Sequence, residues 1–339
     1  MGAGPLLELE NLSTHYVSAQ GTRVVRAVEG VSLRINAHET LGIVGESGSG
    51  KSTLALTILR VLPPAARIAS GRMLFEGEDL LQKSEAQMRR VRGKRIAMIL
   101  QDPMASLNPL FTIGDQVAEP IRVHEGAGRA AAWRRAYELL KAVRIASPQT
   151  RLRQHPHEMS GGMRQRIVGA IGISCEPRLL IADEPTTSLD LTIQAQYLNL
   201  LRELQRAHGL ALIFITHNLG IVAKMCDQLA VMYAGRVVES GPVRQIFNTP
   251  AHPYTQALLN SIPRMGDNRQ RLTAIDGQPP DLSTLPPGCA FAPRCPSAFD
   301  RCREAAPPEI ITGDGRTVRC WLRVPQAASV NVGAQRGVA

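Results

Sequence analysis

The chain has 339 residues, of which 44% are hydrophobic and 4% aromatic, and it carries a formal net charge of +10. This length predicts two domains, and the low aromatic content argues against a base-stacking surface. No segment reaches the ~18 apolar residues of a membrane-spanning helix, and residues 1–5 do not resemble a secretory signal. We therefore expect a chain that stays in the cytoplasm and reaches a membrane only through a partner.

The first predicted elements are β-strands. Apolar and polar residues alternate over 7–12 and again over 31–35, as in half-buried strands, and Gly21-Thr22 suits a turn between strands. A short apolar run at 40–44 then ends in a glycine-rich loop, and a helical stretch follows over 52–62. The order at this point is therefore strand, loop, helix.

The glycine-rich loop fits the phosphate-binding pattern G-x-x-x-x-G-K-[ST] in full, between a strand and a helix. Glycines allow backbone N–H groups to turn toward phosphates, and the helix N-terminus adds the positive end of its dipole. We expect Lys51 to reach the β- and γ-phosphates and Ser52 to bind Mg²⁺. The predicted nucleotide-binding residues of the loop are Gly45, Glu46, Ser47, Gly48, Ser49, Gly50, Lys51, Ser52 and Thr53.

An interruption follows over about 102–178, where the alternation of strands and helices is lost. Leu107-Asn108-Pro109 opens a loop, and residues 130–143 have a helical pattern. We interpret this stretch as an inserted helical subdomain.

Two more buried strands are predicted at 179–182 and 211–216, with an amphipathic helix at 193–208 between them. Such alternation favours a parallel α/β sheet, whose ligands lie at the carboxyl ends of the strands. Asp183 ends the first of these strands, where a carboxylate that orients Mg²⁺ is expected, and Glu184 is then placed to polarise an attacking water.

The last predicted strands, 229–233 and 236–239, flank Ala234-Gly235, a hairpin signal. Beyond residue 250 the composition changes to proline and cysteine, which indicates a domain boundary. We therefore divide the chain into residues 1–250, a small Cys-rich C-terminal domain at 251–325, and a flexible tail at 326–339.

Further motifs select among the phosphate-loop families, and with them the chain resembles the ABC ATPases. Gln101 matches the Q-loop, Ser160-Gly161-Gly162 the signature motif, Ser188-Leu189-Asp190 the D-loop and His217 the switch histidine, while Tyr16 stands where the family has an adenine-stacking aromatic. The resemblance implies an α/β P-loop ABC ATPase fold with a parallel sheet core, an antiparallel β subdomain and a helical insertion. It also implies ATP as the nucleotide, with Mg²⁺.

The same resemblance implies a head-to-tail dimer. Ser160 and the two glycines after it precede a helix and would form a second anion-binding N-terminus, suited to the ATP of an opposing subunit. Glu184, His217 and Gln101 are the implied catalytic residues. The implied Mg²⁺ ligands are Ser52, Gln101 and Asp183, and the other implied nucleotide contacts are Tyr16, Ser160, Gly161, Gly162 and Asp190.

Motifs near the C-terminus resemble one branch of that family, the oligopeptide/dipeptide importers. They are the segments 252–259 (HPYTQALL) and 288–296 (GCAFAPRCP). The resemblance implies a peripheral protein on the cytoplasmic face of the inner (plasma) membrane. Its implied partners are a second ABC ATPase, two membrane permeases and an extracytoplasmic solute-binding protein, with no nucleic acid.

The cargo stays open at this point between peptides, glutathione, nickel and glycosides. Two other classes of protein are also considered: the soluble ABC ATPases of DNA repair or translation, and a regulatory module with a degenerate ATPase. The single cassette argues against the first class, and the presence of Lys51, Glu184 and His217 argues against the second.

Four cysteines crowd this C-terminal region: Cys289, Cys295, Cys302 and Cys320. Cytosolic redox conditions disfavour disulfides, and the spacing C-x5-C-x6-C-x17-C is not that of a zinc ribbon. The family resemblance points to a [4Fe–4S] cluster held by the four thiolates, which would also stabilise a proline-rich segment that has few aliphatic residues to form a core of its own. Zinc and no metal are the alternatives. By length of intervening chain, we expect this site more than ~20 Å from the nucleotide.

Overall fold

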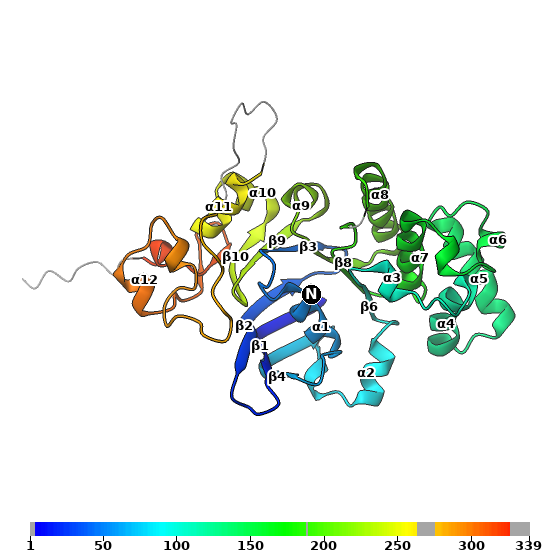
Figure 1. Cartoon of the computed structure of the whole chain (residues 1–339), viewed down its shortest axis with the longest axis horizontal. Helices are drawn as coiled ribbons and strands as arrows, with labels where there is room; N and C mark the ends of the chain where they lie inside the picture. The colour runs from blue at the N-terminus through cyan, green and yellow to red at the C-terminus, as the bar shows by residue number, and fades with distance from the viewer. Residues whose placement is uncertain (1–3, 188, 263–274, 326–339) are drawn as a thin grey trace, which may run out of the picture.

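The structure, a computed structural model, describes residues 4–187, 189–262 and 275–325. Ser188 of the predicted D-loop and the predicted flexible tail at 326–339 lie outside the described residues. The described chain forms one large sheet of eight strands, with the order β11-β12-β10-β9-β3-β8-β7-β6, and a smaller sheet beside it (Figure 1). The strands of the large sheet are β3 (Thr40–Val44), β6 (Ile96–Ile99), β7 (Leu179–Asp183), β8 (Ala211–Ile215), β9 (Gln228–Tyr233), β10 (Arg236–Pro242), β11 (Ile310–Ile311) and β12 (Thr317–Val318).

The predicted parallel core is confirmed. Every residue of β3, β7 and β8 is buried, and β9, β3, β8, β7 and β6 pair in parallel in that order. Strands covered on both faces read as continuous apolar runs, which is why these segments are recognisable in the sequence. Their carboxyl ends bring the glycine-rich loop, Asp183-Glu184 and His217 to the same edge of the sheet.

The predicted antiparallel β subdomain is the smaller sheet, with the order β2-β1-β4-β5. Its hydrophobic face and that of helix α1 (Lys51–Leu59) share one core, which includes Leu12, Val28, Leu54 and Phe75. Sequence reasoning did not find β4, because none of its first seven residues is buried and its pattern is irregular. The strands are β1 (Leu7–Val17), β2 (Val24–Ile35), β4 (Ala66–Phe75) and β5 (Glu78–Asp79).

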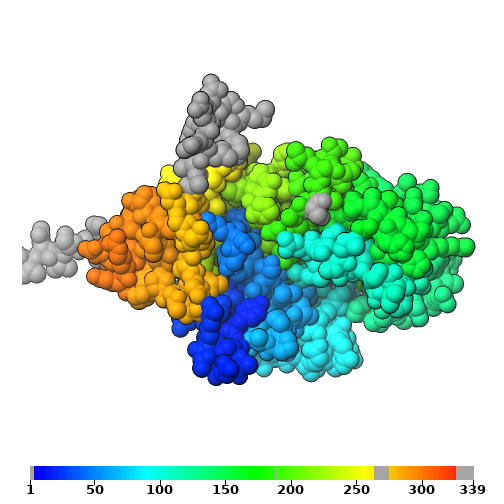
Figure 2. Space-filling view, in the orientation of Figure 1, coloured from blue at the N-terminus to red at the C-terminus, as the bar shows by residue number. Residues whose placement is uncertain are grey.

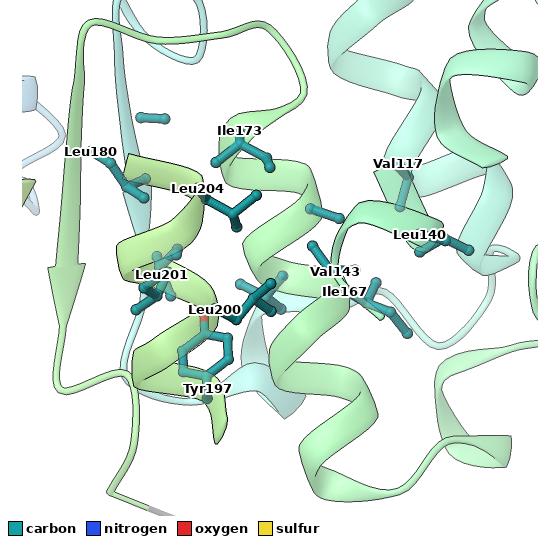
Figure 3. Packing of buried hydrophobic residues seen from close by; sticks show 14 of the residues in the cluster. Val117, Leu140, Val143, Ile167, Ile173, Leu180, Tyr197, Leu200, Leu201 and Leu204 are labelled. Carbon is teal, nitrogen blue, oxygen red and sulfur yellow. The ribbon is translucent and has the colours of Figure 1, made fainter. Parts of the chain in front are cut away.

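Helices occupy the predicted insertion. Their apolar faces meet α8 (Leu191–His208) in a core that includes Val117, Leu140, Ile167 and Tyr197 (Figure 3). Among the described residues, no helix is both long and apolar enough to cross a membrane. The insertion contains α3 (Pro103–Ser106), α4 (Ile113–Glu125), α5 (Arg129–Ala142), α6 (Pro148–Arg151), the 3-10 turn Pro156–Glu158 and α7 (Gly161–Ile173).

The hairpin between β9 and β10 is confirmed, and both turn residues adopt positive φ, 47° at Ala234 and 80° at Gly235. The remaining elements described before residue 275 are helical. They are α1 (Lys51–Leu59), α2 (Glu85–Val91), α9 (Leu219–Met225), α10 (Val243–Asn248) and α11 (Pro253–Asn260), with a 3-10 turn at Leu80–Gln82.

The expectation of a separate Cys-rich C-terminal domain is not supported. Strand β12 adds to the edge of the large sheet beside β10, and Phe291 and Tyr254 share a hydrophobic core with Val44 and Tyr233 of the ATPase. Figure 2 shows the C-terminal segments, in yellow and orange, lying against the N-terminal strands, in blue. The proline-rich segment thus gains its buried area from the ATPase core. Its own short elements are α12 (Asp300–Glu304) and the 3-10 turns Ala292–Arg294 and Trp321–Arg323.

Candidate functional site

The phosphate loop owes its shape to three glycines with positive φ, Gly45 at 156°, Gly48 at 77° and Gly50 at 102°. A Cβ added at Gly50 would lie 2.1 Å from the carbonyl oxygen of Ala27 in β2, so only glycine fits this close approach. The loop leads directly into α1, whose first residue is Lys51. The N-terminus of α1 therefore faces the hollow of the loop, the arrangement that binds phosphate in this motif.

Lys51 lies folded back over the loop. Its ammonium donates to the carbonyl oxygens of Gly45, at 2.8 Å, and Glu46, at 2.9 Å. Burial lowers the pKa of Lys51, and the carboxylates of Glu184, Asp183 and Glu46 act in the opposite direction. A buried ammonium held by two neutral carbonyls gains from an anion placed beside it, which fits the predicted contact with phosphates.

Asp183 fits the predicted magnesium ligand. Its side chain is buried, and its Oδ1 atom has no hydrogen-bond partner among the described residues. Burial raises the pKa of Asp183, and the Ser52 side chain opposes this effect. Buried carboxylate oxygens without partners are costly unless a donor or a cation meets them. Asp183 and Ser52 would therefore hold a Mg²⁺ ion, which supplies charge neutralisation at the β- and γ-phosphates when bound.

The other predicted catalytic residues, Gln101 and His217, both lie close to the carboxylate of Glu184. Gln101 Nε2 donates to its Oε2 atom at 3.2 Å, and the Thr187 hydroxyl donates to the same atom at 2.9 Å. Nδ1 of His217 lies 3.4 Å from Oε1 of Glu184. The structure thus brings together Glu184, His217 and Gln101 from three different strand ends. Their roles in catalysis stay predictions.

Replacing Asp183 by Asn is expected to remove most of the contribution of Mg²⁺ to ATP binding, because the variant loses the charge that faces the cation. The affinity gained on adding Mg²⁺ should fall by about tenfold or more, the scale of a hydrogen-bonded charge. A fluorescent ATP analogue titrated with and without Mg²⁺ measures this difference. Asp300→Asn, which makes the same charge change at an exposed position, is the matched control. An unchanged Mg²⁺ effect in Asp183→Asn would remove this residue from the metal site.

The predicted signature motif lies apart from the phosphate loop. Ser160 caps α7, and its hydroxyl accepts from the backbone N–H of Met163 at 3.4 Å. Ser160 and Gly161 are exposed, and a Cβ added at Gly161 would meet nothing within 4 Å. In Figure 1, α7 lies beyond β6 from α1. The exposed N-terminus of α7 is thus available to a ligand other than the one in its own phosphate loop.

Asp190 and Tyr16 are two further predicted nucleotide contacts. Asp190 caps α8, because its carboxylate accepts from the N–H groups of Thr192 and Ile193, at 3.0 and 2.9 Å. These contacts give Asp190 a structural role at the start of the helix. The Tyr16 hydroxyl lies 3.3 Å from the Thr53 hydroxyl, in the first turn of α1. Tyr16 is therefore beside the phosphate loop. Contacts of Asp190 and Tyr16 with nucleotide stay predictions.

Two residues at the loop were given no role by sequence reasoning. Arg294 donates to both carboxylate oxygens of Glu46, at 2.7 and 2.9 Å, and the backbone N–H of Glu46 donates to the Tyr254 hydroxyl at 3.0 Å. Arg294 and Tyr254 both lie in the C-terminal motifs, where they are recognised only as part of the family resemblance. The length of intervening chain led us to expect this segment to lie far from the nucleotide. Arg294, the neighbour of Cys295, instead contacts the phosphate loop directly.

The prediction of a [4Fe–4S] cluster is wrong. Within 4–187, 189–262 and 275–325, no group of three or more His, Cys, Asp or Glu residues is placed to hold a metal ion. The four cysteines line one cavity of about 20 Å³, which has room for about one water molecule. Burial raises the pKa of Cys320 to about 11 and also raises those of Cys289 and Cys295. The thiols of Cys289, Cys295, Cys302 and Cys320 are free.

Comparison with known proteins gives two family matches. The family described as "ABC transporter" matches residues 28–187, and the family described as "Oligopeptide/dipeptide transporter, C-terminal region" matches residues 238–302. The second match covers most of the region in which Arg294 and Tyr254 contact the phosphate loop. Both matches agree with the motifs on which the resemblance rests.

Individual relatives align over nearly the whole chain. A probable peptide ABC transporter ATP-binding protein, y4tR of Sinorhizobium fredii, is 51% identical over 93% of this chain and 94% of its own length. The dipeptide transport ATP-binding protein DppD of Bacillus subtilis is 48% identical over 95% of this chain and 96% of its own. The solved dimeric structure of MJ0796, a bacterial ABC transporter cassette, is 25% identical, covers 70% of this chain and 99% of its own, and superposes with a TM-score of 0.62.

Proposed function

The chain belongs to the ABC transporter family of ATP-binding proteins, and from that premise we propose that it is the ATP-hydrolysing motor of a peptide importer. The observation that carries the proposal is the near-full-length similarity to peptide and dipeptide transport ATP-binding proteins, which includes the C-terminal region as well as the ATPase. A soluble ABC ATPase of DNA repair or translation would have no need of that C-terminal region. No observation favours glutathione, nickel or glycosides as cargo over peptides.

The chemistry proposed for the site follows from its contacts. Lys51 and the loop amides bind the phosphates, while Asp183 and Ser52 orient Mg²⁺. Glu184, held by Gln101 and Thr187, polarises the attacking water. His217 faces the other carboxylate oxygen of Glu184 and links its position to the γ-phosphate. Loss of that phosphate on hydrolysis then changes the contacts of Gln101, the residue that leads into the helical insertion.

A complete site is proposed to need two subunits. The N-terminus of α7 is exposed and lies away from the phosphate loop of its own chain, so its free N–H groups suit the nucleotide of an opposing ATPase. We propose that the opposing subunit is a second ABC ATPase and that two permeases and an extracytoplasmic solute-binding protein complete the importer. The chain would then act as a peripheral protein on the cytoplasmic face of the membrane.

Gly161→Ala tests the shared site sharply. The added methyl group meets nothing within 4 Å in the isolated chain, so folding and ATP binding should be unchanged. In the assembled complex the methyl group would lie between α7 and the partner's nucleotide, and turnover should fall by about tenfold to a hundredfold, as for a misplacement of ~1 Å. ATP hydrolysis is measured for the isolated chain and for the chain co-purified with its permeases and second ATPase.

Gly128→Ala is the matched control, because Gly128 likewise lies at the N-terminus of a helix of the insertion, as the N-cap of α5, and has equally open surroundings. It should hydrolyse ATP like the wild type in the complex. Equal turnover of Gly161→Ala and Gly128→Ala in a verified complex would contradict a site completed by α7. Fast turnover by a proven monomer would contradict it as well.

A further inference from the structure

Glu46 of the phosphate loop has three polar groups, and two of them are held by the C-terminal region. Its carboxylate accepts both hydrogen bonds of the Arg294 fork. Its backbone N–H donates to the Tyr254 hydroxyl, and its carbonyl oxygen accepts from Lys51 at 2.9 Å. The conformation of the loop at Glu46 is therefore set partly from outside the ATPase motifs.

The pair of Arg294 and Glu46 is itself anchored firmly. The Arg294 side chain is only 4% exposed and that of Glu46 is 26% exposed. Arg294 also donates to the carbonyl oxygens of Asp276, at 2.9 Å, and Ile275, at 3.2 Å. A fifth bond runs from Arg294 to the Tyr233 hydroxyl, at 3.2 Å. Together these bonds satisfy the donors of the guanidinium and fix its plane, which a bidentate contact with a carboxylate requires.

An aromatic cluster supports the same contact. Tyr233, Tyr254 and Phe291 are all almost fully buried, and their ring centroids lie 4.5 to 5.3 Å apart. The Arg294 guanidinium lies 5.8 Å from the Tyr233 ring and 6.0 Å from the Phe291 ring. Tyr233 belongs to the ATPase sheet, whereas Phe291 and Tyr254 follow it in the chain. The cluster thus joins the C-terminal region to the strand beside the phosphate loop.

The position of this contact matters for nucleotide binding. In this structure Lys51 bonds the carbonyl oxygens of Gly45 and Glu46, and the same ammonium is expected to bind phosphates. The direction of these carbonyls and of the neighbouring N–H groups depends on where Glu46 is held. A loop that is already ordered before ATP arrives loses less conformational entropy on binding.

We propose that Arg294 and Tyr254 are positioning residues for ATP binding, and that the docked C-terminal region keeps the phosphate loop in its nucleotide-binding conformation. Displacement of this region, by a partner subunit for example, would then weaken ATP binding. The inference rests on the proposed function only in taking Mg–ATP as the ligand. It concerns nucleotide binding by the isolated chain, which needs neither permeases nor transport.

The test compares the affinity of the full-length chain for a fluorescent ATP analogue with Mg²⁺ among single variants. Tyr254→Phe removes one hydroxyl from an otherwise unchanged ring and should weaken binding about 2- to 10-fold, the scale of one hydrogen bond. Arg294→Met should weaken it about 10-fold or more, because a charged, bidentate contact is lost. Arg294→Lys keeps the charge but not the fork and should restore only part of the affinity.

Arg316→Met is the matched control. Arg316 forms a buried ion pair with Glu239 in the same region, with side chains 7% and 0% exposed, and makes no contact with the phosphate loop among the described residues. This variant loses a comparable buried pair, so it should unfold at a lower temperature and still bind the analogue like the wild type. In the assembled complex, Tyr254→Phe should raise the KM for ATP more than it lowers kcat.

A second set of variants covers the case that Arg294→Met fails to fold. Glu46→Gln combined with Arg294→Met removes both charges, so no unpaired charge stays buried. Its affinity should still be about 10-fold weaker, since the fork is absent. The proposal is overturned if Tyr254→Phe and the folded Arg294 variants bind within twofold of the wild type, or if Arg316→Met weakens binding as much as they do. Absence of Mg–ATP binding by the wild-type chain would instead overturn the proposed function.

Discussion

Glu184→Gln is expected to lower ATP turnover of the assembled complex by about two orders of magnitude or more while ATP binding stays intact, the scale of a lost proton-handling group. The amide fills the same space and can still contact Thr187 and His217, so the fold around it should not change. What it loses is the negative charge and basicity that polarise the attacking water. Single-turnover hydrolysis and analogue binding, measured on the same preparation, separate the two effects.

Glu176→Gln is the control for this prediction. Glu176 is exposed and precedes β7, so it lies at the opposite end of the strand from Glu184. Its replacement should leave turnover unchanged. Near-normal turnover by Glu184→Gln in the complex would remove Glu184 from the mechanism and would leave the water to be activated by another group.

Lys51→Met is expected to weaken Mg–ATP binding by about a hundredfold or more, since one ammonium would otherwise contact two phosphate groups through charged hydrogen bonds. The thioether side chain preserves much of the buried apolar stem, so the loop keeps its packing. Lys224→Met, which loses the same charge at an exposed position on α9, should bind like the wild type. Equal affinities for the two variants would show that Lys51 does not contact the phosphates.

The parts of the fold that the sequence predicts best are those with short-range signals. Strands β3, β7 and β8 are continuous apolar runs because both faces are covered, and the phosphate loop has a fixed spacing of glycines and lysine. The β9–β10 hairpin is marked by its two turn residues. Each of these signals depends on neighbours in the chain, so no knowledge of the tertiary structure is needed to read it.

The assignment of Gln101 and Glu184 to one catalytic site came from the family resemblance. Nothing local links Gln101 to Glu184, 83 residues apart, and their order in the family motifs carried the expectation. The bond between Arg294 and Glu46 spans 248 residues and had no such guide. Ion pairs between residues so far apart in the chain produce no periodic pattern in the sequence, so only the structure reveals them.

The cysteine prediction failed because the C-terminal segment was treated as a unit that had to stabilise itself. Few aliphatic residues and many prolines do argue for a staple if the segment stands alone. Phe291 and Tyr254, however, are buried against Tyr233 and Val44 of the ATPase. The large sheet supplies the apolar surface that the segment lacks, and the need for a metal disappears.

The most direct test of the central claim is ATP-driven uptake of a labelled dipeptide by vesicles that contain the complete importer, with ATP and Mg²⁺ inside and the solute-binding protein outside. The account predicts accumulation of the dipeptide with the wild-type chain, and none when the chain carries Lys51→Met or when ATP is omitted. Uptake that is equal with and without ATP, or equal for wild type and Lys51→Met, would contradict an ATP-driven motor. ATP hydrolysis by the wild-type complex with no movement of dipeptide would contradict the peptide importer.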